Sequence, residues 1–217
     1  GLFLLPVGLV GALYLVLWQR ASLGRKKLWQ AALLGALAFL VLTVPPYLHY
    51  LQLEPELYQL IDELQTGSAT YSADLLSWWL PSGMHPLWRA LTAPFYASFT
   101  TPNLMETTVF VGYLPLLCLL VSFGLRRVSP ALRFWQMLAV CGWLLSLGPV
   151  LHVKGKPLFT PLPYALFEAL PGFSGFRVPS RAGITAALAL SVVAMLVLQQ
   201  LMARYRRAPW PIILTAG

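Results

Sequence analysis

Long stretches without any charged residue are the feature that most constrains this chain. Charged residues make up 10% of its 217 residues, against roughly 25% in an ordinary soluble domain, and they are clustered. A transmembrane helix needs about 20 predominantly apolar residues to cross a hydrocarbon core of ~30 Å. Five stretches at or near that length contain no charge: residues 1–19, 28–48 (the uncharged run continues to 53), 107–125, 134–153 and 182–203.

These stretches predict an all-α, polytopic helical membrane protein. We expect about five transmembrane helices and the start of a sixth after Trp210, within a single transmembrane domain over residues 1–217. The first stretch lacks the basic start and small-residue cleavage site of a signal peptide, so we expect an internal fragment of a longer membrane protein. The net charge of +8 does not require nucleic acid, because basic loops flank membrane spans.

The distribution of charge predicts the orientation. Short cytoplasmic loops of membrane proteins are rich in Lys and Arg. The two long loops, about 54–106 and 154–181, contain all seven acidic residues. We therefore expect residue 1 and the long loops outside the cell inner (plasma) membrane, and the short basic loops in the cytoplasm. The short loops hold ten of the fifteen basic residues: Arg20, Arg25, Lys26, Lys27, Arg126, Arg127, Arg133, Arg204, Arg206 and Arg207.

The two long loops are expected to carry short interfacial helices. Apolar residues recur at helical spacing over 54–65, which predicts a helix in the membrane interface. Ser72 is placed to cap a second short helix with Asp74 in its first turn. The other loop is rich in Pro and Gly, which leaves room for one short helix around residues 164–170. Loops of this length usually carry function.

The strongest candidate site lies where the second long loop enters the last charge-free stretch. Arg177, Ser180 and Arg181 precede that stretch directly. A helix N-terminus has unpaired N–H groups and a partial positive charge, and the planar fork of arginine matches phosphate oxygens. This combination predicts an anion-binding corner. The alternative is that Ser180 caps the helix while the arginines extend to lipid headgroups.

Other polar residues have a structural explanation beside a functional one. Asp74 either binds substrate or stabilises a helix start, and Glu106 either acts in the site or forms a capping box with Asn103. His85 precedes Pro86 and is either a ligand or base, or a hydrogen-bonding loop residue. Cys118 and Cys141 fall inside expected spans, where they pack, and no spacing in the chain is typical of a metal site. No cofactor is visible in the sequence.

Several short motifs, in this order along the chain, carry a resemblance to a known family. They are YSADLLS at 71–77, PS at 81–82, HP at 85–86, VGYLPLL at 111–117, SLGP at 146–149 and PGFSGFRVPSR at 171–181. Over roughly residues 45–190 the chain resembles the later half of bacterial polytopic membrane glycosyltransferases of the GT-C type. Such enzymes use a polyprenyl-phosphate-linked sugar on the outer face of the membrane.

The resemblance also implies an acidic base or metal-binding residue in an external loop that would precede Gly1. It therefore leaves room for a divalent metal in the full-length protein. No catalytic residue is assigned within the present chain.

The expected function is transfer of a sugar from a polyprenyl-phosphate donor to an acceptor on the outer face of the membrane. Arg177, Ser180 and Arg181 would bind the phosphate, with Asp74 and His85 as further substrate-binding candidates. The expected partners are membrane lipids and the lipid-linked donor, and not nucleic acid. The alternative is a non-catalytic membrane protein: a lipid or polysaccharide transporter subunit or an assembly scaffold.

Overall fold

The computed structural model describes residues 68–99, 104–125, 128–168 and 178–207, with isolated helical positions between residues 8 and 48. Most of the expected spans 1–19 and 28–48, the expected helix over 54–65, and Arg177 lie outside the described residues. The elements are the 3₁₀ helix η2 (Leu75–Trp78), α4 (Arg89–Tyr96), α5 (Leu104–Thr107), α6 (Tyr113–Phe123), α7 (Pro130–Ser146), β1 (Leu151–Val153), β2 (Lys156–Phe159), α8 (Tyr164–Glu168), the 3₁₀ helix η3 (Pro179–Arg181) and α9 (Ala182–Arg207).

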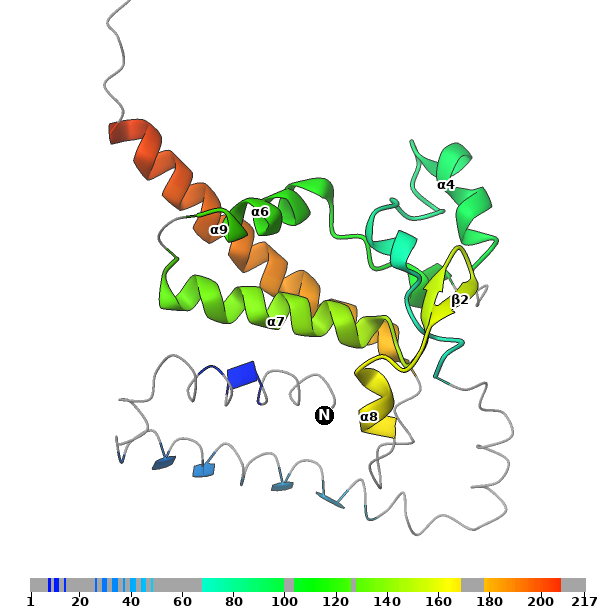
Figure 1. The fold of residues 1–217 in the computed structure, drawn as a ribbon, viewed down its shortest axis with the longest axis horizontal. Coiled ribbons are helices and arrows are strands. Elements are labelled where there is room, and N and C mark those ends of the chain that lie inside the picture. The colour runs from blue at the N-terminus through cyan, green and yellow to red at the C-terminus, as the bar shows by residue number, and fades with distance from the viewer. Residues whose placement is uncertain are drawn as a thin grey trace, which may run out of the picture.

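Helix α9 is the longest element and covers the last expected span, residues 182–203. Together with η3 it forms a helix over Pro179–Tyr205, whose 27 residues are long and apolar enough to cross a membrane. At 1.5 Å per residue this helix is ~40 Å long, which exceeds a hydrocarbon core of ~30 Å. In Figure 1, α9 is the long helix that runs diagonally across the molecule. The short helix expected around 164–170 is confirmed, as α8.

The expectation of an all-α protein with about five transmembrane helices is wrong. Among the described residues, only Pro179–Tyr205 pass as a helix long and apolar enough to cross a membrane. The stretch 107–125 does not form one membrane-spanning helix, because its first part is not helical. Residues 108–112 have no regular secondary structure, and Gly112 adopts a φ of +97°. The remaining helix, α6, has 11 residues and a length of only ~16 Å.

The stretch 134–153 does not form one membrane-spanning helix either, because its C-terminal part is not helical. Helix α7 begins where Ser129 accepts a hydrogen bond from the Leu132 N–H at 3.1 Å and Pro130 occupies the first turn. It ends after 17 residues, because Gly148 has a φ of +71° and Pro149 follows. The chain then forms β1, which pairs with β2 as an antiparallel hairpin. The charge-free stretch 134–153 therefore contains a helix, a turn and a strand, and not a single helix.

Helices α6, α7 and α9 pack together around the core (Figure 1). Leu138 and Ala139 of α7 pack with Ala186 and Leu190 near the start of α9. Residues earlier on α7 pack with residues later on α9, so the two helices are antiparallel. These residues form a second core cluster, which contains Cys118 of α6, Leu132 of α7, and Val193, Ala194 and Val197 of α9.

Gly142 sets the distance between α7 and α9. A Cβ atom at this position would lie 2.8 Å from the backbone nitrogen of Ala186 and 3.1 Å from the carbonyl oxygen of Ala182. Small residues on both helices thus allow the two backbones to approach closely, as is common where helices associate in membranes.

The remaining elements gather at the end of this helix pair where α9 begins. Ala73 N–H donates to the carbonyl of Ser146 at 2.9 Å, and the indole N–H of Trp78 donates to the Ser146 hydroxyl at 3.1 Å. Ser180 N–H donates to the carbonyl of Tyr71 at 3.2 Å. Residues 71–78 are therefore tied to the end of α7 and to the start of the long helix.

We expect Gly142→Ala to destabilise the protein. The added methyl group forces α7 away from α9, and overpacking of this kind costs about 1–3 kcal/mol. Thermal unfolding of the detergent-solubilised protein measures the effect. Gly124→Ala is the matched control, because its Cβ meets nothing closer than 3.5 Å. Equal unfolding temperatures for the two variants would contradict the close contact.

Candidate functional site

A salt bridge stands at the N-terminal end of the long helix. The guanidinium of Arg181 donates to the carboxylate of Glu106 at 2.7 Å. Arg181 belongs to η3 and Glu106 to α5, so the pair joins two elements that are 75 positions apart in the chain. The Arg181 side chain is 57% exposed, whereas that of Glu106 is 19% exposed. The guanidinium has five N–H donors, so it can bind an anion while Glu106 holds it in place.

The salt bridge borders a cavity of about 430 Å³. Arg181, Ile184 and Ala187 contribute to it from successive turns of the same helix, so it runs from the charged end toward apolar side chains. Such a cavity suits a ligand with one anionic end and one apolar end. The described residues that line it are Glu106, Thr108, Val109, Phe110, Val111, Ser180, Arg181, Gly183, Ile184 and Ala187.

Ser180 lines the same cavity, and its hydroxyl is buried. Its side chain is 3% exposed, and its Oγ has no hydrogen-bond partner. The alternative that Ser180 caps the helix is therefore wrong. A buried polar group without a partner is costly and rare in folded proteins. A ligand that accepts or donates a hydrogen bond here would remove that cost.

Asp74 holds the fold together and does not line the cavity. It is 1% exposed. One carboxylate oxygen accepts from the Leu76 N–H at 2.9 Å and thereby caps η2, and the other accepts from the Gly155 N–H at 2.8 Å. Gly155 is in the turn between β1 and β2 and has a φ of +73°. The helix expected after Ser72 thus exists as the short η2, with Asp74 rather than Ser72 as its cap.

His85 also lies away from the cavity. Its Nδ1 accepts hydrogen bonds from the N–H groups of Leu87 at 3.2 Å and Trp88 at 3.3 Å. This is the local loop role that the sequence allowed. The structure therefore brings together Ser180 and Arg181, but not Asp74 or His85.

Sequence reasoning missed two contributions to the cavity. Glu106 was considered for a capping box with Asn103, which lies outside the described residues, and not as the partner of Arg181. Thr108 was not considered at all. A signal for the pairing existed: Glu106 and Arg181 each precede a charge-free stretch on the same predicted side of the membrane.

Comparisons with protein families, with curated proteins and with solved structures found no match to this chain. The described residues contain no group of three or more His, Cys, Asp or Glu side chains that would hold a metal ion. The site must therefore be interpreted from its own geometry.

A second buried polar group, His152 of β1, affects stability rather than the cavity. Its side chain is 6% exposed and its Nδ1 has no partner. Burial lowers the pKa of His152, although the charge of Asp74 acts in the opposite direction. The unfolded chain, with a histidine pKa of ~6.5, therefore binds a proton more readily than the folded one.

We expect the free energy of unfolding to be constant with respect to His152 above pH ~6.5 and to fall as the pH drops below that value. Thermal unfolding measured between pH 7.5 and 5 in about half-unit steps shows the fall. His152→Gln should flatten this dependence, and His85→Gln, which retains His152, should not. A fall that persists unchanged in His152→Gln would rule out this assignment.

Proposed function

We propose that this chain is part of a membrane-bound glycosyltransferase that takes its sugar from a polyprenyl-phosphate donor. The observation that carries the proposal is the position of Arg181, which lines a partly apolar cavity at the end of a helix able to cross a membrane. The acceptor receives the sugar on the outer face.

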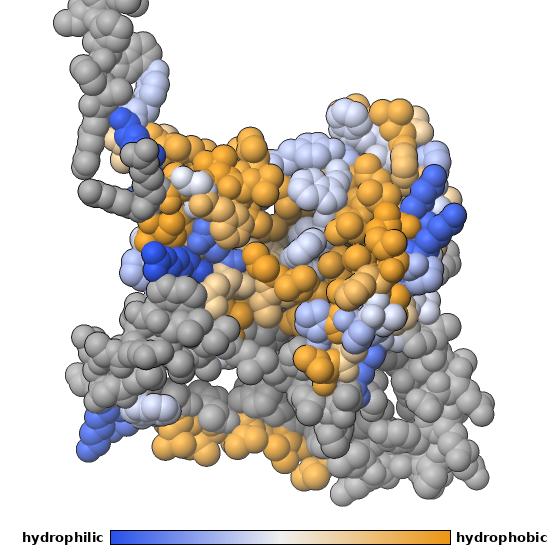
Figure 2. Space-filling model, viewed as in Figure 1, coloured by the Kyte–Doolittle hydropathy of each residue, from blue (hydrophilic) through white to orange (hydrophobic). Residues whose placement is uncertain are grey.

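The geometry fits an amphiphilic donor. Its lipid tail lies in the bilayer and its phosphate lies at the membrane surface. Arg181 is the third residue of the helix Pro179–Tyr205, so it reaches the surface when this helix spans the bilayer. Exposed apolar side chains on α6 and α9 suit contact with lipid, and Figure 2 shows orange surface in the region of α6. These side chains include Leu114, Leu117, Leu120, Ile184, Leu188 and Met195.

The residues of the cavity have distinct roles in the proposed reaction. The bond between the anomeric carbon and the phosphate oxygen breaks, and the phosphate leaves with the electron pair. The acceptor hydroxyl forms the new bond to the anomeric carbon, and its proton passes to an oxygen of the departing phosphate. Arg181 stabilises the charge that the phosphate gains, and Ser180 lies beside it in the lining of the cavity. Glu106 holds the guanidinium of Arg181 in position.

The proposed orientation places Arg181 outside and the C-terminal end of α9 in the cytoplasm. Arg204, Arg206 and Arg207 lie at that end, and no acidic residue follows Glu168 in the sequence. This distribution agrees with the excess of basic residues on the cytoplasmic side of membrane proteins.

One observation favours a second candidate, a non-catalytic membrane protein such as a transporter subunit or an assembly scaffold. The salt bridge to Glu106 by itself supplies a structural role for Arg181, because it joins α5 to η3. In that case Glu106 and Arg181 contribute equally to stability, and removing either one lowers the unfolding temperature by the same amount.

Arg181→Gln tests the proposal in the full-length protein reconstituted into vesicles. It removes a charge-assisted contact worth roughly 1.5–3 kcal/mol, so we expect release of polyprenyl phosphate to slow by about one to two powers of ten. Arg181→Lys should recover only part of the rate, because it keeps the charge and loses the fork. Arg89→Gln, at an exposed position of α4, is the control and should have no effect.

Glu106→Gln separates the two candidate functions. If the protein is a transferase, Glu106→Gln leaves the charge of Arg181 in place, so donor binding should persist. Arg181→Gln removes that charge, so donor binding should be lost. In the structural candidate, Glu106→Gln and Arg181→Gln lower the unfolding temperature alike and neither affects transfer specifically. Unchanged transfer by correctly inserted Arg181→Gln would overturn the proposed function.

A further inference from the structure

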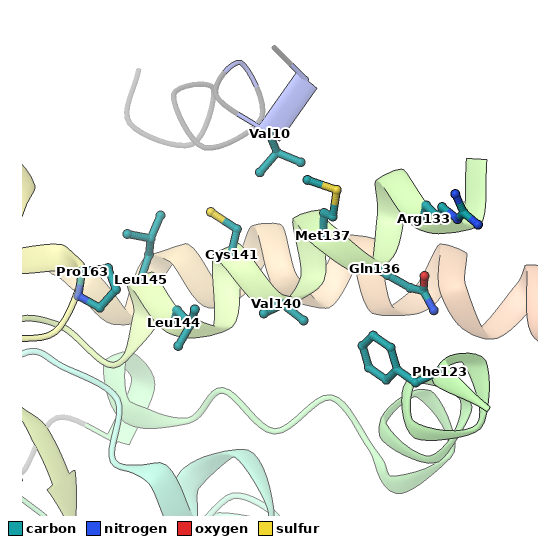
Figure 3. Close-up of a pocket in the computed structure, with 10 residues that line it drawn as sticks. All are labelled: Val10, Phe123, Arg133, Gln136, Met137, Val140, Cys141, Leu144, Leu145 and Pro163. Carbon is teal, nitrogen blue, oxygen red and sulfur yellow. The ribbon is translucent and has the colours of Figure 1, made fainter. Parts of the chain in front are cut away.

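A groove along α7 forms a second candidate binding region, separate from the Glu106–Arg181 cavity. Its volume is about 540 Å³. Figure 3 shows it between Val10 on one side and Phe123 on the other, with Arg133 and Pro163 at its two ends. The side chains that line it from α7 are Arg133, Gln136, Met137, Val140, Cys141, Leu144 and Leu145.

The groove is apolar along its length and polar at one end. The α7 residues from Met137 to Leu145 that line it are all apolar, and they recur every three or four positions along one side of the helix. From Arg133 to Leu145 the helix rises ~18 Å. This length is close to the ~15 Å thickness of hydrocarbon in one membrane leaflet. The groove therefore has room for an extended hydrocarbon chain.

Positive charge gathers at the polar end. Arg133 is exposed in the first turn of α7, and Arg204 lies at the same end of the antiparallel helix pair, near the end of α9. The sequence adds Arg126 and Arg127 just before α7 and contains no acidic residue between Glu106 and Glu168. Gln136 is already engaged, because its amide donates to the Ser122 hydroxyl at 2.7 Å. Among the described residues that line the groove, Arg133 is the one with a charged side chain.

We propose that this groove binds one acyl chain of an anionic phospholipid, with Arg133 contacting the phosphate. The apolar side chains of α7 hold the chain, and Arg133 selects a headgroup with net negative charge. Arg133, at the polar end of the groove, lies at the end of the helix pair opposite to the proposed donor site. The occupant of the groove is a resident lipid of the other leaflet rather than a substrate.

The test uses the full-length protein reconstituted into phosphatidylcholine vesicles. These contain a small fraction of phosphatidylglycerol whose acyl chain carries a photoreactive group. Mass spectrometry then locates the crosslinks. We expect them at α7, between Met137 and Leu144. Arg133→Gln should lower labelling by phosphatidylglycerol about tenfold, in line with loss of a charge-assisted hydrogen bond.

Arg204→Gln is the matched control, because it removes the same charge at the same end but does not line the groove. It should leave labelling nearly unchanged. Val140→Trp fills the groove and should lower labelling by phosphatidylglycerol and by a phosphatidylcholine probe alike. Circular dichroism verifies folding of each variant. If Val140→Trp does not fold, the comparison of phosphatidylglycerol labelling between Arg133→Gln and Arg204→Gln tests the proposal.

Three results would overturn the proposal. The first is equal labelling by the two lipids in the unmodified protein, which would remove the selection for charge. The second is an equal loss in Arg133→Gln and Arg204→Gln, which would indicate general attraction to the membrane surface. The third is crosslinking that avoids α7, as occurs when a protein partner covers the groove. None of these readouts depends on sugar transfer, so they are independent of the proposed function.

Discussion

The close contact between α7 and α9 at Gly142 is the interaction on which the rest of the structure depends. It lets the backbone of α7 approach Ala182 and Ala186 near the start of α9. The C-terminal end of α7 is thereby held beside that start, and Ser146 binds both the backbone of Ala73 and the indole of Trp78. The position of residues 71–78, and through Asp74 that of the β-hairpin, follows from one glycine in a helix interface.

The antiparallel pair has chemically different ends. At one end, the Glu106–Arg181 salt bridge and the buried hydroxyl of Ser180 border a cavity with apolar walls. At the other end, the described residues include Arg133 and Arg204 but no acidic residue, and a groove along α7 opens beside Arg133. Both proposals follow from the same principle. Each region combines a fixed cation with a run of apolar side chains, and an amphiphile with an anionic head complements that combination.

The sequence was informative where local rules decide the structure. Helix α9 and the short α8 were predicted, and Ser180 and Arg181 do meet in one cavity. The number of spans was wrong, because absence of charge does not distinguish a helix from the extended residues before Gly112 or the turn at Gly148. Asp74 stabilises a helix start, which was one of its two predicted roles. Its hydrogen bond with Gly155 could not be predicted, because Gly155 lies 81 positions away and only the tertiary fold brings them together.

The central claim is that α9 crosses the membrane with Arg181 outside. Accessibility of engineered cysteines in intact cells tests it most directly, in a background where Cys118 and Cys141 are replaced by alanine. Met84 is 54% exposed on the Arg181 side, and Ala208 directly follows α9. The account predicts that a membrane-impermeant thiol reagent labels Met84→Cys in intact cells and labels Ala208→Cys only after the membrane is opened. Labelling of both positions in intact cells, or of Ala208→Cys alone, would contradict it.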